Sequence, residues 1–217
     1  MNNNQPINEL DELMCKYKSD KGCWYHNYCR IYSMYLTICK NDILKVLEIG
    51  IEEGKSLFAW RDFFPNAQIY GVDITKHSLV SSNMDRITCL YGDSTDILWV
   101  EKTIKPLGEF DLIVDDGSHI SKDMITCLDF YFPNLLASGG VYIIEDLNIT
   151  NSKKSLIKRN PETITDYLFK LINEMNWYDE NCTCNDGEKY GSKPINHWQS
   201  TLNFINFYRG IVILSKK

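Results

Sequence analysis

The chain has 217 residues, of which 29 are Asp or Glu and 23 are Lys or Arg, so its net charge is −6. Hydrophobic residues make up 44%, which indicates one globular domain over residues 1–217 and excludes a disordered or collagen-like chain. The acidic balance excludes nucleic acid as the main partner, because phosphate binding needs a basic face. Neither a signal peptide nor a membrane span is recognisable, so we expect a cytoplasmic protein.

Eight cysteines are many for a protein of a reducing compartment. None forms a Cys-x-x-Cys pair, which disfavours a zinc ribbon or a thioredoxin-like redox site. Cys182 and Cys184 could hold a metal together with His197. Reduced, partly buried thiols are the interpretation that we prefer.

The first forty residues, 1–40, are rich in Tyr and Cys and are expected to form an N-terminal segment that is helical at its end. The core is expected at residues 41–217. Its first strand is predicted at residues 42–50, where a short apolar run ends at Gly50. The next segment, 55–64, has a helical pattern that Pro65 ends.

Four further strands are predicted at residues 68–73, 86–91, 110–115 and 140–144, with helical patterns such as 121–136 between them. Strands that alternate with helices predict a parallel sheet with right-handed connections.

The C-terminal part differs, because three residues join the apolar runs 201–207 and 211–214, and so short a connection permits only an antiparallel hairpin. A helix is predicted at 162–176, and the polar stretch 177–199 is expected to be a long functional loop. We therefore predict an α/β, Rossmann-like fold with a mostly parallel, seven-stranded sheet, flanking helices and a C-terminal antiparallel hairpin.

The end of the first strand has the features of a cofactor-binding turn. Glycines there let the backbone turn sharply and approach a ligand. Glu52 lies in the middle of the turn and would repel a pyrophosphate, so a cationic or zwitterionic ligand suits it better. The residues expected to line this part of the cofactor site are Glu48, Gly50, Gly54 and Ser56.

Two acids follow the next strands. Asp73 ends the second strand, where a carboxylate can accept hydrogen bonds from both ribose hydroxyls. Asp93 follows the third strand and could bind an adenine amino group. A glycine turn, then an acid placed for the ribose, then an acid after the third strand is an order that fits S-adenosylmethionine better than NAD.

Four acids mark the ends of the fourth and fifth strands, namely Asp115, Asp116, Glu145 and Asp146. Strand ends on one edge of a parallel sheet converge on the ligand crevice, where such acids repel unless they are protonated or neutralised by a cation. Oxygen ligands favour Mg²⁺ or a similar divalent ion, for which Asp116, Glu145 and Asp146 are the candidate ligands. The alternative is that these acids cap helices or bind backbone amides, and Asp115 is expected to be structural or cofactor-facing.

His119 lies three residues after Asp116 in a loop at the strand ends, which makes it a candidate base. Methyl transfer to an alcohol needs such help, because an aliphatic hydroxyl is a weak acid. A metal would lower the pKa of the hydroxyl, and His119 would take its proton as the oxygen attacks the sulfonium methyl.

Taken together, the chain resembles class I S-adenosylmethionine-dependent methyltransferases, and specifically the metal-dependent O-methyltransferases of macrolide and other antibiotic sugars. The matching stretches are Ser19-Asp20-Lys21-Gly22 with His26, Tyr28 and Tyr32; Val46 to Gly50; Trp60 to Ala67; Ile69 to Asp73; Asp115 to His119; Ile143 to Leu147; and Ile205 to Tyr208.

The resemblance implies that Asp116, Glu145 and Asp146 bind magnesium and that His119 is the base. It also implies that Lys21, His26 and Tyr28 belong to a segment that closes over the cofactor, although the same aromatic residues could simply be packing. Members that act on macrolides often carry an extra N-terminal domain, and this chain has no room for one.

Three functions remain open. The first is O-methylation of a sugar hydroxyl on a glycan, a nucleotide sugar or a glycosylated metabolite. The second is O-methylation of a catechol-like or other small hydroxyl compound, and the third is a cofactor-binding module without catalysis. The expected partner is thus a small-molecule or glycan acceptor with a free hydroxyl, and the aromatic-rich first forty residues are compatible with a homodimer.

Overall fold

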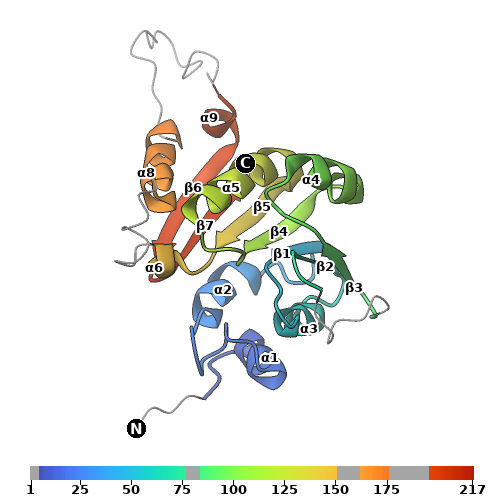
Figure 1. Ribbon diagram of the computed structural model, residues 1–217. Helices are drawn as coiled ribbons and strands as arrows, with labels where there is room; N and C mark the ends of the chain where they lie inside the picture. Colours follow the sequence, from blue (N-terminus) through green and yellow to red (C-terminus); the bar gives the residue numbers. More distant parts are fainter. Residues whose placement is uncertain (1–4, 77–83, 151–161, 176–195) are drawn as a thin grey trace, which may run out of the picture.

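A computed structural model describes residues 5–76, 84–150, 162–175 and 196–217 of the chain (Figure 1). Its centre is a seven-stranded sheet of order β3-β2-β1-β4-β5-β7-β6. The strands are β1 (Lys45–Ile49), β2 (Gln68–Asp73), β3 (Ile87–Tyr91), β4 (Phe110–Asp115), β5 (Leu136–Ile144), β6 (Leu202–Tyr208) and β7 (Ile211–Lys216). Strands β1 to β5 pair in parallel, and β7 is antiparallel to both β5 and β6. The predicted fold class, strand number and closing hairpin are confirmed.

Helices cover both faces of this sheet (Figure 1). The described helices are α1 (Glu9–Tyr17), α2 (Cys29–Leu36), α3 (Lys55–Phe63), α4 (Ile97–Thr103), the 3-10 helix η1 (Lys105–Leu107), α5 (Ser121–Leu135), α6 (Leu147–Thr150), α8 (Ile164–Met175) and α9 (His197–Thr201). The N-terminal helices α1 and α2 share one face with α3, and α4, α5 and α8 pack on the other. Among the described residues, none of these helices has the length and apolar character to cross a bilayer.

The sheet is apolar on both faces, which explains the unbroken apolar runs of its strands. Along β4, Leu112 and Val114 belong to the core under α1, α2 and α3, whereas Ile113 belongs to the core under α4, α5 and α8. A strand that is buried on both sides has no polar face, so it loses the alternation of a half-exposed strand. The strand ends are then the places where polar side chains can gather.

The structure corrects several predicted boundaries. Strand β5 begins at Leu136, four residues before the predicted strand. Residues 197–201, expected in a loop and a strand, form α9, because the side chain of Asn196 caps the helix by accepting a hydrogen bond from the Gln199 amide at 3.2 Å. Residues 177–195 of the predicted loop, with Cys182 and Cys184, lie outside the described residues. The six described cysteines form no disulfide with one another.

The turn after β1 depends on Gly50, which has a φ of +80°. A Cβ atom at this position would lie 2.0 Å from the backbone oxygen of Asp116. The loop after β4 therefore packs directly against the glycine turn after β1, and only glycine fits both the backbone angle and the space.

We expect Gly50→Ala to destabilise the protein by more than Gly139→Ala, a matched control with a φ of +77° and nothing within 4 Å of its added Cβ. The control carries only the left-handed strain of about 1–2 kcal/mol, and overpacking adds about 1–3 kcal/mol at Gly50. Urea unfolding of both variants measures the difference, and equal losses would show that the contact with Asp116 is unimportant.

Candidate active site

The turn after β1 is held in place by Asp73 at the end of β2. One carboxylate oxygen, Oδ2, accepts hydrogen bonds from the amides of Ile51 at 3.1 Å and Glu52 at 3.0 Å. The other oxygen accepts from the Thr75 amide at 2.8 Å. Asp73 therefore holds the turn in place and also lines the adjoining cavity. Its position at the end of β2 did not predict this structural role.

This first cavity has a volume of about 330 Å³ and lies at the carboxyl ends of β1, β2, β3 and β4. Four of the predicted cofactor-binding residues line it together, namely Gly50, Asp73, Asp93 and Asp115. Carboxyl ends of parallel strands are the usual place for a nucleotide-like ligand in an open α/β sheet.

A second cavity of about 160 Å³ lies on the other side of Gly50, which lines both. Its lining includes three more predicted residues, Lys21, Glu48 and Ser56. The Ser56 hydroxyl lies 2.8 Å from each carboxylate oxygen of Glu48, and the indole of Trp60 donates to the same group at 3.0 Å. Gly54 lines neither of the two cavities and is instead the N-terminal cap of α3, with a φ of +74°.

Lys21 is the centre of the site and is 1% exposed. Its ammonium lies 3.2 Å from Glu48 and 3.0 Å from Glu145, and it also donates to Asp116. These three carboxylates come from the ends of β1, β5 and β4, so one cation from the N-terminal segment joins three strands.

Burial and charge act against each other in this cluster. Burial opposes the charged form of Lys21, yet the three carboxylates hold its pKa well above the usual value. Burial also raises the pKa of Glu48, Asp116 and Glu145, against the lowering effect of Lys21. One ammonium cannot neutralise three carboxylates, of which Glu48 and Glu145 are buried, so the cluster must take up protons or a further cation.

Asp116, His119 and Asp146 form the second part of the site, with ligand atoms close enough to hold one metal ion. The Nε2 atom of His119 lies 4.0 Å from Asp116 and 3.8 Å from Asp146. Its Nδ1 atom is buried and has no hydrogen-bond partner among the described residues. Both His119 and Asp146 have a φ of +54°, a strained conformation that is typical of functional sites.

Glu145 does not join this second group. Its carboxylate accepts from Lys21 and from the phenol of Tyr32, a residue of α2, and it is 1% exposed. Tyr32 belongs to one of the matching stretches but was not predicted as a site residue. The four-residue spacing between Tyr28 and Tyr32 could have shown that both phenols reach the same region.

Tyr28 and His26 approach the site from the N-terminal segment. The Tyr28 phenol donates to Asp146 at 2.7 Å, and Nδ1 of His26 lies 3.7 Å from the same carboxylate. The two rings stack with centroids 5.0 Å apart. Both line a third cavity of about 540 Å³, whose rim also carries Arg30 and Arg209.

Asp115 is buried at the end of β4 and lines the first cavity. Its carboxylate accepts from the Tyr142 phenol at 3.2 Å and from the Gly117 amide at 3.4 Å. Burial nevertheless raises its pKa to about 7, because the two hydrogen bonds offset only part of the desolvation.

The raised pKa of Asp115 predicts a stability that depends on pH. The folded state keeps the proton up to pH about 7, whereas the unfolded chain loses it near pH ~3.9. The contribution of protonated Asp115 to the free energy of unfolding is thus complete below pH ~4 and disappears as pH rises through about 7. Asp115→Asn stays neutral, so its unfolding free energy relative to wild type should rise by about 2–3 kcal/mol from pH 5 to pH 8. Urea unfolding in EDTA measures this, and parallel pH profiles would contradict it.

Comparison with known proteins was made by sequence and by structure. A search against protein-family models found no match. The chain is 35% identical over 146 residues to the mycinamicin VI 2''-O-methyltransferase of Micromonospora griseorubida, which covers 64% of this chain and 36% of the relative. It is also 35% identical over 147 residues to a tetracenomycin-C rhamnosyl 3'-O-methyltransferase of Streptomyces olivaceus, covering 64% of this chain and 37% of the relative. The chain thus spans about a third of the length of these relatives.

The same group of enzymes is found by structure. The MycE methyltransferase from the mycinamycin biosynthetic pathway, solved in complex with Mg, SAH and mycinamycin VI, superposes with a TM-score of 0.79 at 26% identity. The superposition covers 96% of this chain and 54% of MycE. These similarities confirm the resemblance that the sequence motifs indicate: the chain has the class I methyltransferase fold and is similar in sequence to sugar O-methyltransferases of antibiotic pathways.

Proposed function

We propose that the chain is an S-adenosylmethionine-dependent O-methyltransferase that methylates a sugar hydroxyl of a glycan, a nucleotide sugar or a glycosylated metabolite with the help of a divalent cation. The observation that carries this proposal is the placement of two adjoining cavities and the Asp116–His119–Asp146 group at one sheet edge. The sugar O-methyltransferases to which the chain is similar support it.

The two cavities that share Gly50 suit the two halves of this cofactor. The first cavity would take the adenosine, with Asp73 on the ribose and Asp93 near the adenine. The second would take the methionine part, whose ammonium and carboxylate match the mixed charges of Glu48 and Lys21. No pyrophosphate is expected, because Glu52 and Glu53 line the second cavity.

The donor set fits Mg²⁺ or a similar ion. Asp116 and Asp146 offer oxygen ligands, and the carboxylates around Lys21 leave negative charge that a single ammonium does not balance. Asp116, Glu145 and Asp146 remain our proposed ligands, with Glu145 joining only if it leaves Lys21 and Tyr32. A bound cation would lower the pKa of the acceptor hydroxyl and hold it in place.

His119 is proposed as the base. Its Nε2 atom lies 4.0 Å from Asp116 and 3.8 Å from Asp146, at the sheet edge where the acceptor hydroxyl is proposed to bind. S-adenosylmethionine, once bound, would supply the methyl group, and His119 would hold the proton that the acceptor hydroxyl loses. Tyr28 and His26 orient Asp146 from the opposite side.

The third cavity is the proposed acceptor site. Stacked His26 and Tyr28 rings offer an apolar surface for a sugar ring beside Asp146. Arg30 and Arg209 on its rim form no ion pair with any of the described residues, so they are available to a phosphate of a nucleotide sugar. This rim favours a charged acceptor over a neutral one.

The setting of the enzyme is part of the proposal. The free cysteines support a reducing compartment, which for this chain would be the cytoplasm. The net charge of −6 argues against a nucleic-acid acceptor. Exposed Trp24, Tyr25 and Met34 in the N-terminal segment support a homodimer.

The proposal is tested by calorimetry with S-adenosylhomocysteine, followed by turnover on a panel of nucleotide sugars, neutral glycosides and catechols. We expect micromolar cofactor binding and methyl transfer to a sugar acceptor that EDTA abolishes and Mg²⁺ restores. Absence of S-adenosylhomocysteine binding would exclude both methyltransferase functions for this chain, on sugars and on small hydroxyl compounds. Cofactor binding without turnover on any acceptor would favour a non-catalytic module, and turnover on catechols alone would favour the small-hydroxyl alternative.

His119→Ala should lower kcat by about 10²–10⁴-fold, the usual contribution of a general base. Mg²⁺ and S-adenosylhomocysteine affinities, measured by calorimetry, should stay the same, because a base holds the proton and not the cofactor. Loss of Mg²⁺ affinity in this variant would instead identify His119 as a metal ligand. His197→Ala is the matched control and should keep kcat, since His197 lies in α9 and lines none of the three cavities.

A further inference from the structure

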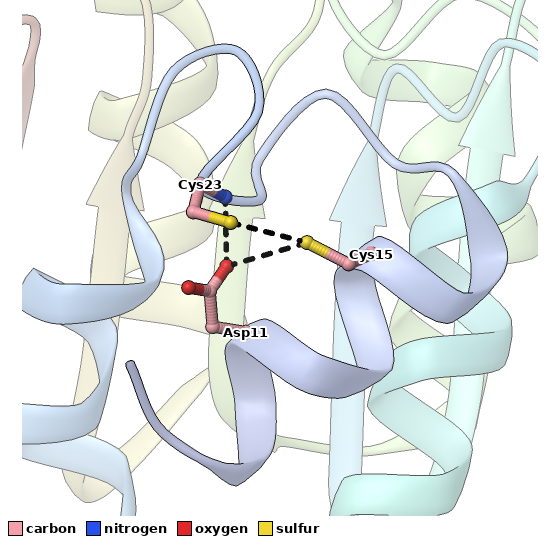
Figure 2. A group of neighbouring side chains, drawn as sticks. All are labelled: Asp11, Cys15 and Cys23. Carbon is pink, nitrogen blue, oxygen red and sulfur yellow. Dashed lines mark hydrogen bonds between the residues drawn. The ribbon is translucent and has the colours of Figure 1, made fainter. Parts of the chain in front are cut away.

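A second cluster of metal-ligating side chains lies away from the sheet edge. Asp11 and Cys15 occupy successive turns of α1 and point toward Cys23, which belongs to the following loop (Figure 2). The three side chains have their ligand atoms within 4.8 Å of one another. None of them takes part in the proposed methyl transfer.

The distances in this cluster match those around a tetrahedral zinc ion. The two sulfur atoms are 3.4 Å apart, and Cys15 Sγ lies 3.8 Å from Oδ1 of Asp11 (Figure 2). Zn–S bonds of about 2.3 Å and a Zn–O bond of about 2.0 Å place two sulfurs roughly 3.8 Å apart and a sulfur and an oxygen roughly 3.5 Å apart. A disulfide would instead require the two sulfurs to approach to about 2.0 Å.

The Asp11 carboxylate is already held in position for such a role. It is fully buried, and it accepts hydrogen bonds from the amides of Ile7 at 3.0 Å and Cys23 at 2.7 Å. Hydrogen bonds of this kind orient metal-binding carboxylates in known sites. No Lys, Arg or His among the described residues forms an ion pair with Asp11. A metal cation could therefore bind this carboxylate without displacing a basic side chain.

Gly22 leaves the space that the cluster needs. A Cβ atom at this position would lie 3.1 Å from Cys15 Sγ and 3.5 Å from Oδ1 of Asp11. The loop backbone can therefore approach both side chains closely. A cavity of about 410 Å³ adjoins Cys15 and is also lined by Pro6, Lys18 and Trp24, which gives solvent access to a fourth ligand.

We propose that Asp11, Cys15 and Cys23 bind one zinc ion, with water as the fourth ligand. Two thiolates and one carboxylate favour zinc over magnesium or calcium, because thiolates are soft ligands. On binding, Zn²⁺ replaces the protons of both thiols, which are released to solvent. The role is structural: the ion joins α1 to the loop that carries Lys21, two residues before Cys23, into the carboxylate cluster.

The test is cobalt substitution of the full-length, reduced protein. Cobalt bound by Cys15 and Cys23 should give the intense near-ultraviolet absorption of a thiolate complex, and equimolar zinc should remove it. Cobalt at the Asp116–His119–Asp146 group contributes no such absorption, since that group contains no thiolate. The readout is therefore independent of methyl transfer.

Cys15→Ser and Cys23→Ser should each abolish this absorption. The matched controls Cys39→Ser and Cys89→Ser, free cysteines elsewhere in the chain, should retain it. The double variant Cys182→Ser/Cys184→Ser should also retain it. Zinc should raise the melting temperature of wild type by more than that of Cys15→Ser, which keeps only the Asp116–His119–Asp146 group, and circular dichroism in EDTA shows whether each variant is folded.

Three results would overturn the proposal. The reduced wild-type protein could lack the thiolate absorption, or the absorption could persist in both Cys15→Ser and Cys23→Ser. A reduced protein that takes up no zinc but forms a Cys15–Cys23 disulfide with oxidised glutathione would show a redox pair instead.

Discussion

One buried ammonium holds the functional edge of this protein together. Lys21 contacts carboxylates at the ends of β1, β4 and β5, and Lys21 and the glutamates of β1 and β5 are almost completely buried. In such surroundings an unpaired charge costs several kcal/mol, so each of these groups depends on the others. The N-terminal segment is therefore part of the site itself and not only a cover over it.

This arrangement separates two kinds of negative charge. Glu48 and Glu145 are fully buried and face Lys21, which makes them parts of the framework. Asp146 faces His119, Tyr28 and His26, and the last two of these line the third cavity. Asp116 touches both groups, since it contacts Lys21 on one side and His119 on the other. A change of charge around Lys21 therefore affects the group around His119 through Asp116, and the reverse also holds.

The sequence is sufficient to predict the sheet and most of the strand-end acids, because these follow from local patterns. Apolar runs of five or six residues mark strands that are buried on both faces, and the acids come directly after them. The contacts between Lys21 and its carboxylates could not be derived in this way. They join residues that are 27 to 124 positions apart, and only the family resemblance indicated Lys21. The Glu145 carboxylate does not join Asp146 because it contacts Tyr32 and Lys21. The positions of these residues along the chain do not predict that contact.

The contact between Gly50 and the backbone of Asp116 has a consequence for how this protein can evolve. Gly50 lines both proposed halves of the cofactor site. The backbone of Asp116 occupies the space that a side chain at this position would need. A mutation that reshapes the glycine turn therefore also displaces the acid next to His119. If the proposed function holds, cofactor preference and cation preference cannot change independently in this scaffold, whereas the proposed acceptor cavity, which has Arg30 of α2 and Arg209 of the β6–β7 turn on its rim, can change without them.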